Sequence, residues 1–222
     1  MNQDNIVTKI ATWLVPLVIA IVFHEVAHGL VARRLGDPTA QERGRLSLNP
    51  LKHVDPFGTL LLPLFLAVTN VGAIFGWAKP VPVNYARLRN PRRDMVLVAL
   101  AGPGTNILLA IASALLFRVL DAQLRGVSAD TASTWTVGVV LPLAQMAYYS
   151  VLINVFLAVF NMLPLPPLDG GRVLTGILPY AQARLVAAIE PFGFVILAVL
   201  LMTHSIGAII QAPVKMILGV LL

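Results

Sequence analysis

Cysteine is absent from this sequence of 222 residues, and its absence excludes several kinds of chemistry. A chain without thiols forms no disulfide, binds no metal through thiolate and uses no cysteine nucleophile. Charged residues are also scarce, at 12% of the chain, whereas soluble domains carry about 25%. The low charge argues against a soluble globular domain.

Apolar residues take the place of the missing charge, at 58% of the chain with a mean hydropathy of +0.83. Several runs approach the roughly 20 residues with which an α-helix crosses a bilayer. We therefore expect an all-α polytopic membrane protein, a helical bundle of about 4–6 transmembrane elements. One integral-membrane domain should cover residues 1–222, with a core over about 10–175 and C-terminal helices over about 180–222.

The formal net charge of +6 and the pI near 10.2 could indicate a nucleic-acid partner. However, the basic residues stand in loops beside apolar runs, and no stripe of aromatic residues accompanies them. Contact with anionic lipid headgroups explains this pattern better. We therefore expect the lipid bilayer, and no nucleic acid, as a partner.

The two most basic loops flank an apolar segment at residues 57–76, which contains Pro63, Asn70 and glycines. Because basic loops favour the cytoplasmic side, both are expected there. A segment that joins two loops on one side does not cross the bilayer fully, so we predict a re-entrant or hairpin element. The flanking loops hold Arg33, Arg34, Arg43, Arg45 and Lys52 before the segment, and Lys79, Arg87, Arg89, Arg92 and Arg93 after it.

The sequence also supports expectations for two other segments. The stretch KPVPVNYA at residues 79–86 has β-compatible residues, and we expect a small β element there, with an edge to which an extended substrate could add. The apolar tail at residues 205–222 fits an interfacial helix or a further bundle element. The whole pattern is typical of a multi-pass protein of the cell membrane, either the plasma or the inner membrane.

The stretch HEVAH stands inside the first apolar run, where every polar side chain is costly. On a helix, His24 and His28 project from one face, and two imidazoles at this spacing can share one Zn²⁺. Glu25 can then act as general base toward a metal-bound water, whose pKa the ion lowers to about 7. The alternative is that both histidines are satisfied packing residues, but their position in a span favours a catalytic metal site.

Zinc needs at least a third protein ligand, and the candidates are Asp169, His53 and His204. Asp169 lies in a stretch rich in proline and glycine just after a predicted span. If residues 57–76 only dip into the membrane, the chain brings Asp169 and HEVAH to the same cytoplasmic depth. We therefore favour Asp169. His53 lies among charged loop residues, and His204 stands at a predicted span end.

Three stretches together, HEVAH, AGPGTN and NMLPLPPLDGG, resemble the site-2 protease family of intramembrane zinc metalloproteases. The resemblance covers most of the chain, including FGWAKPVPVN. It implies one Zn²⁺ per chain, with His24, His28 and Asp169 as ligands and Glu25 as catalytic base.

The same resemblance implies further site residues. Asn161 would bind substrate or the developing oxyanion, and Gly102 with Asn106 matches a GxxxN pattern near the active site. From the residues alone, other roles remain open. Asn161 could cap helix carbonyls, and Gly102 is better explained by close helix packing. Asn106 could either form hydrogen bonds between helices or be part of the site.

The activity that the resemblance implies is hydrolysis of peptide bonds in or near transmembrane segments of other membrane proteins, as in regulated intramembrane proteolysis. Longer relatives carry a PDZ or CBS domain, and this chain resembles a short form without either. The alternative is a membrane-embedded zinc-binding protein or transporter without protease activity. The expected partners are transmembrane protein substrates, and a homo-oligomer or a regulatory membrane partner is compatible with the sequence.

Overall fold

The computed structural model describes residues 6–61, 68, 76–125, 127, 133–203 and 205–222. The described residues form helices and connecting segments, with no β-strand among them. Within the described part of the chain, four helices are long and apolar enough to cross a membrane, namely Ile10–Arg34, Pro91–Leu124, Thr136–Asn161 and Tyr180–Met202. The prediction of an all-α polytopic membrane protein is confirmed.

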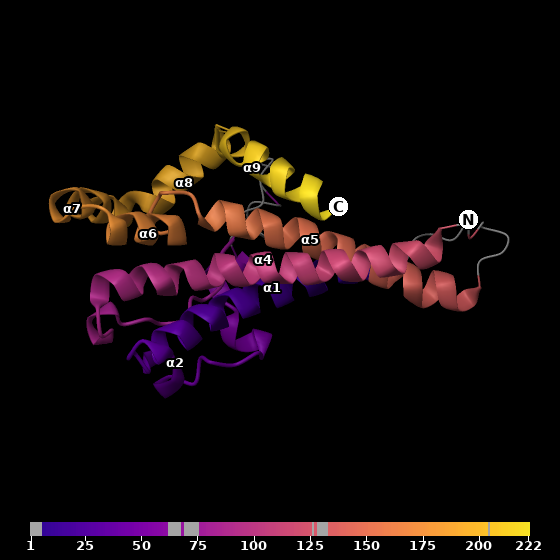
Figure 1. Ribbon diagram of the computed structural model, residues 1–222, viewed down its shortest axis with the longest axis horizontal. Helices are drawn as coiled ribbons and strands as arrows, with labels where there is room; N and C mark the ends of the chain where they lie inside the picture. Colours follow the sequence, from indigo (N-terminus) through magenta and orange to yellow (C-terminus); the bar gives the residue numbers. More distant parts are fainter. Residues whose placement is uncertain (1–5, 62–67, 69–75, 126, 128–132, 204) are drawn as a thin grey trace.

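The central bundle consists of three long helices that lie side by side (Figure 1): α1 (Ile6–Arg34), α4 (Pro91–Leu124) and α5 (Leu141–Asn161), the last continuing the π-helical turn Thr136–Val140. Small buried residues line their contacts and let the backbones approach closely, which drives helix association where lipid is as apolar as the side chains. They include Ala20, Ala110, Ala114, Ala144 and Ala147.

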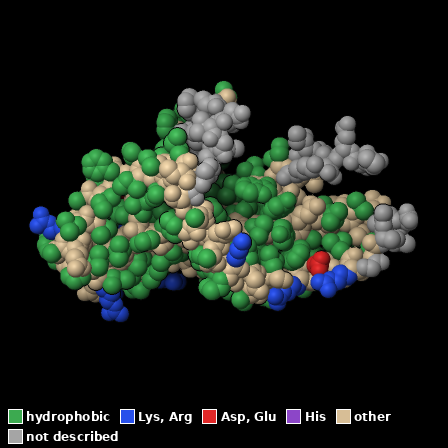
Figure 2. Space-filling view, turned by 90° about the horizontal axis from the view of Figure 1, so that it is seen from above, with side chains coloured by type: hydrophobic (Ala, Val, Ile, Leu, Met, Phe, Trp, Pro, Cys, Tyr) green, Lys and Arg blue, Asp and Glu red, His purple; other side chains and the backbone are tan. Residues whose placement is uncertain are grey.

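The outer surface of the molecule is apolar, as a lipid-facing surface must be. Leu108, Leu115 and Val119 of α4 are more than half exposed. Figure 2 shows hydrophobic side chains over most of the described surface on one face, with few charged side chains between them. The exposed apolar side chains therefore fit the bilayer that the sequence predicts as a partner.

Helix α5 ends where prolines begin, because proline lacks the amide hydrogen that continues a helix. The turn over residues 162–168 leads into the short helix α6 (Asp169–Ile177), which packs on α4. Gly170, at the start of α6, is required for this close return, because a Cβ there would collide with the backbone carbonyls of Met162 and Leu163. The tight turn thus brings Asp169 back against the central bundle.

The C-terminal helices are α7 (Tyr180–Ile189), the 3₁₀ turn Glu190–Phe192, α8 (Gly193–Met202) and α9 (Ser205–Leu221). In Figure 1, α9 turns back and runs along α5. Its residues Val214 and Ile217 pack against the buried cluster of α4 and α5. Of the two expectations for the tail, a further bundle element is the one that this packing supports.

The segment at 57–76 was expected to be re-entrant, but residues 62–67 and 69–75 lie outside the described residues. Its two ends are described and lie together. The amide of Trp77 donates to the carbonyl of Gly58 over 3.1 Å, and the Thr59 hydroxyl donates to the carbonyl of Trp77 over 2.8 Å. A re-entrant element requires this proximity, because its entry and exit are at one membrane surface.

The expectation of a β element at 79–86 is not met. Residues 77–84 run without regular secondary structure, and Tyr85–Arg87 is a 3₁₀ turn. Pro80 and Pro82 have no amide hydrogen to give to a ladder. The available amides are bonded elsewhere: that of Lys79 donates to the carbonyl of His53, and that of Val81 to the side chain of Glu25. We call residues 77–85 the strap.

Candidate metal centre and active site

The two histidines of HEVAH lie on the inner face of α1. Their spacing of one helical turn puts both imidazoles on the same side, with His24 Nε2 3.1 Å from His28 Nε2. Both residues are buried, at 7% exposure each. Two imidazole nitrogens held this close inside an apolar bundle fit a shared cation better than ordinary packing.

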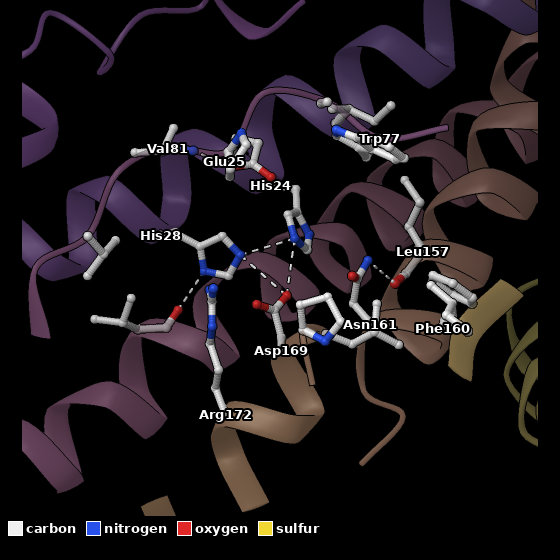
Figure 3. Close-up of a pocket in the computed structure, with 18 of the residues that line it drawn as sticks. His24, Glu25, His28, Trp77, Val81, Leu157, Phe160, Asn161, Asp169 and Arg172 are labelled. Atoms are coloured by element: carbon white, nitrogen blue, oxygen red, sulfur yellow. Dashed lines mark hydrogen bonds and ion pairs between the residues drawn. The ribbon is translucent and has the colours of Figure 1, made fainter. Parts of the chain in front are cut away.

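Asp169 completes the cluster, as the sequence predicted (Figure 3). Its Oδ2 lies 3.2 Å from His24 Nε2 and 3.3 Å from His28 Nε2. Burial opposes ionisation of Asp169, yet the two imidazoles hold the pKa of its carboxyl well below the ordinary value. The side chain is therefore a carboxylate. Among the residues that the structure describes, these three form the one cluster of this kind.

The other nitrogen of each imidazole is bonded to an oxygen acceptor. His24 Nδ1 lies 2.6 Å from Asn106 Oδ1, and His28 Nδ1 lies 2.7 Å from the carbonyl of Val98. Because both acceptors are carbonyl oxygens, each Nδ1 carries the proton and each Nε2 presents a lone pair. Both lone pairs are thereby directed to the side on which Asp169 lies.

The three ligand atoms fit Zn²⁺. Asp169 Oδ2 is buried and has no hydrogen-bond partner, which is costly unless a cation satisfies it. A set of two imidazoles and one carboxylate is typical of catalytic zinc sites, which keep a further position open. We therefore assign His24, His28 and Asp169 as the residues that would hold one Zn²⁺.

Gly102 packs directly against the imidazole pair. A Cβ at this position would lie 2.5 Å from His24 Cε1 and would overlap the ring of His28. The prediction that Gly102 serves close packing is thus confirmed, and the side chains that pack on it are the metal ligands His24 and His28. Gly104, two residues further along α4, has open space around it.

Asn106 combines the two roles that were left open for it. Its Oδ1 accepts a hydrogen bond from His24 Nδ1, and its Nδ2 donates to Asn154 Oδ1 over 2.8 Å and to the Ala20 carbonyl over 3.3 Å. It is fully buried and does not line the cavity. Asn106 therefore positions His24 and joins three helices.

Asn154 was not identified as a site residue from the sequence. It is fully buried on α5 and continues the chain of hydrogen bonds to Ser150, whose hydroxyl lies 2.7 Å from that of Ser113. An amide in the middle of an apolar span was the available signal, because buried polar groups in membranes have partners or functions.

Glu25 lies at the wall of a cavity of about 510 Å³. Its Oε2 accepts a hydrogen bond of 2.7 Å from the amide of Val81. In the view of Figure 3, the imidazole pair lies between Glu25 and Asp169. The carboxylate is thus held by the strap beside the metal ligands, as a general base requires.

Most of the cavity wall is apolar, contributed by the strap, α5 and α8. Asn161 also lines the cavity. Its Nδ2 donates a hydrogen bond of 2.9 Å to the carbonyl of Leu157, one turn earlier on α5. This contact is the helix-capping interaction that the residues alone allowed. An amide has a second N–H, so the bond leaves a donor for a substrate. Apolar lining residues include Ile21, Trp77, Val81, Phe160, Phe194 and Leu197.

The other histidines lie apart from the cluster or outside the description. His53 is buried in the first basic loop, where its Nε2 lies 2.8 Å from the carbonyl of Ser47. It is not part of the ligand cluster. His204 lies outside the described residues.

The strap is held to the end of α1 by a buried carboxylate that the sequence did not single out. Asp37 accepts the amide of Asn84 over 2.6 Å, and its other oxygen accepts the amide and hydroxyl of Thr39. Desolvation opposes its ionisation, but these hydrogen bonds lower the pKa of Asp37 below its ordinary value. The network fixes the strap next to the catalytic cavity.

Comparisons with known proteins agree with this geometry. The sequence model of Peptidase family M50 matches residues 12–204. The "Putative zinc metalloprotease YwhC" of Bacillus subtilis (strain 168) is 36% identical over 200 residues, which cover 90% of this chain and 84% of that protein. The "Putative zinc metalloprotease Rip2" of Mycobacterium tuberculosis H37Rv is 34% identical over 206 residues, covering 90% and 69%. No solved structure matches significantly.

Proposed function

This chain belongs to peptidase family M50, and from that premise we propose that it is an intramembrane endopeptidase. As a zinc metalloprotease, it would cut peptide bonds in or near transmembrane segments of other membrane proteins. The observation that carries the proposal is the position of the ligands. His24 and His28 lie within the span Ile10–Arg34, and Asp169 follows shortly after the span that ends at Asn161.

The chemistry needs few groups. Bound Zn²⁺ would supply Lewis acidity, which polarises the peptide carbonyl and makes a water molecule more acidic. Glu25 accepts a proton from the attacking water and returns it to the leaving nitrogen. The Val81 amide holds the Glu25 carboxylate in place, and Asn106 and the Val98 carbonyl orient the two imidazoles.

The cavity supports an apolar, unwound peptide as substrate. A helical substrate hides its carbonyls in hydrogen bonds along the helix, so it must unwind locally before attack. Aromatic and aliphatic side chains from the strap and α8, among them Trp77 and Phe194, can cover the apolar side chains of the unwound part. Regulated intramembrane proteolysis would use such a site.

We also propose the side on which the site opens. The basic loops before and after residues 57–76 lie in the cytoplasm, and the active site faces that side of the cell membrane. The contact between Gly58 and Trp77 supports this arrangement, because it joins the two loops at one level. The cysteine-free sequence makes the test direct: R43C and R93C should both react with a membrane-impermeant thiol reagent only when the cytoplasmic face is accessible. Labelling from opposite faces would refute the topology.

The activity is tested with purified protein and a panel of single-span substrates. We expect cleavage by the zinc-loaded protein, loss of cleavage with a chelator, and loss of cleavage in E25Q with zinc retained. E190Q is the matched control, because Glu190 is exposed and lies outside the cavity. If the wild-type protein cuts no substrate while transporting zinc into liposomes as well as E25Q does, the chain is a zinc transporter and the proposal is wrong.

A further inference from the structure

We propose that Arg172 is a further catalytic residue, which binds the peptide carbonyl oxygen as that oxygen gains negative charge. The inference rests on the proposed peptidase function and adds a group to the same site. None of the motifs in the sequence singled out Arg172. Its assignment comes from its position, its contacts and its charge.

Arg172 stands one helical turn after the ligand Asp169 on α6. Residues three apart on a helix share a face, and both side chains line the same cavity as His28 and Glu25. Figure 3 shows the Arg172 side chain rising beside Asp169 toward the ring of His28. The guanidinium therefore lies in the part of the cavity where the reacting bond must be placed.

The contacts of Arg172 leave most of its donors available. Its guanidinium carbon lies 5.7 Å from the centre of the Tyr85 ring, in a cation–π contact. A guanidinium has five N–H donors. Among the described residues, no carboxylate lies within 4.0 Å of Arg172, whereas Arg87 and Arg125 are each paired with one. A half-buried cation that forms no ion pair with a carboxylate is suited to bind an anion that forms during a reaction.

The charges of the site favour the same conclusion. The two carboxylates of Glu25 and Asp169 would balance the two charges of Zn²⁺, so the loaded site without Arg172 is neutral. Arg172 adds one positive charge in a cavity with mostly apolar walls. In such surroundings a charge-assisted hydrogen bond is stronger than a neutral one. Asn161 keeps one free N–H but is a neutral amide, so the charged Arg172 is the stronger donor for an oxyanion.

The step balances in atoms and electrons. The oxygen of water bonds to the carbonyl carbon, and its proton passes to Glu25. The π-electron pair of the carbonyl moves to the carbonyl oxygen, whose negative charge Arg172 binds through N–H donors. When the pair returns, the C–N bond breaks, and the leaving nitrogen takes the proton from Glu25.

The alternative is that Arg172 only fastens the strap to α6 through the Tyr85 ring. A fastening role predicts that Y85L and R172Q lose activity and thermal stability together. An oxyanion role predicts that R172Q lowers kcat much more than Y85L does, because Y85L keeps the cation. R172K, which keeps the charge but not the planar fork, should fall between R172Q and the wild-type protein.

The experiment compares R172Q and R172K with R184Q, a control at an exposed arginine of α7. We expect R172Q to lower kcat by about 10²–10³-fold, as loss of one oxyanion donor does, with KM, zinc content and melting temperature near the wild-type values. Binding gives a second readout. R172Q should weaken a phosphinic peptide, whose tetrahedral group is anionic, and leave a neutral ketomethylene peptide of the same sequence unchanged.

The outcomes separate this inference from the proposed function. If the wild-type protein cuts no substrate, the proposed peptidase function is wrong, and the role of Arg172 falls with it. If the wild-type protein cuts, E25Q does not, and R172Q has wild-type kcat, the oxyanion role is wrong while the peptidase stands. Equal weakening of both peptides would also overturn it. If R172Q does not fold, R172K decides: unchanged kcat and unchanged phosphinic-peptide affinity would contradict the proposal.

Discussion

Asp169 Oδ2 and His24 Nε2 lie 3.2 Å apart, although the first belongs to the helix after α5 and the second to α1. Three features of the chain produce this contact. The prolines after α5 end the helix, Gly170 allows the tight return, and α6 packs on α4 beside the imidazole pair. The metal centre therefore joins the first helix of the bundle to the segment after α5.

Replacement of Asp169 should remove the metal before it affects the fold. We expect D169N to bind zinc at least about 10–100-fold more weakly, because a neutral amide replaces the anionic ligand at almost the same volume. Metal content after dialysis against a graded chelator measures this. D121N is the control, since Asp121 forms an exposed pair with Arg125. Equal zinc content in D169N and wild type would refute the ligand assignment.

Two glycines of α4 provide a matched comparison. We expect G102A to lower zinc affinity and the melting temperature, because the added methyl group would overlap the imidazoles of His24 and His28. G104A adds the same methyl group in open space, and its melting temperature should be unchanged or slightly raised, since alanine favours the helix by about 1 kcal/mol. Zinc content and thermal unfolding in detergent measure both. If the two variants behave alike, Gly102 does not pack on the ligands as described.

The sequence was sufficient for the ligands and for Asn106, and insufficient for the other groups that orient the ligands. The spacing of His24 and His28 fixes their common face, and the basic loops and the helix break after α5 bring Asp169 to their depth. The carbonyl of Val98 bonds to His28, and the side chain of Asn154 bonds to Asn106. Both groups face the site only because α4 and α5 are rotated about their axes to a particular angle. That rotation depends on side-chain packing, which no local pattern in the sequence records.

The strap shows a second limit of prediction from the sequence. Residues 79–86 have strand-like composition, yet a strand exists only with a partner, and here the amides of Lys79 and Val81 bond to His53 and Glu25. Composition reports what a segment can form, while the partner depends on the tertiary fold. Arg172 was missed for a similar reason, because its place in the cavity follows from the packing of α6.

The orienting role of Asn106 can be tested apart from its role between helices. N106L should lower zinc affinity by about 10–100-fold, as loss of a hydrogen-bond partner behind a histidine ligand does, because His24 Nδ1 loses its acceptor. S113A removes a hydrogen bond between the same two helices, α4 and α5, without touching a ligand. Competition with a zinc-binding dye measures the affinity. A loss in S113A as large as in N106L would assign the effect to helix packing.

The Asp37 network predicts a dependence of stability on pH. The folded pKa of Asp37 is lowered, so its contribution to stability is present above the unfolded pKa of about 4 and is lost as the pH falls through the folded value. D37N removes the charge and one acceptor for Thr39 and Asn84, so it should melt below wild type at pH 7, and the difference should shrink toward pH 3. Melting temperatures of both proteins, with D121N at a partly exposed carboxylate as control, measure the gap. A gap that is constant from pH 7 to pH 3 would show that the Asp37 charge does not hold the strap.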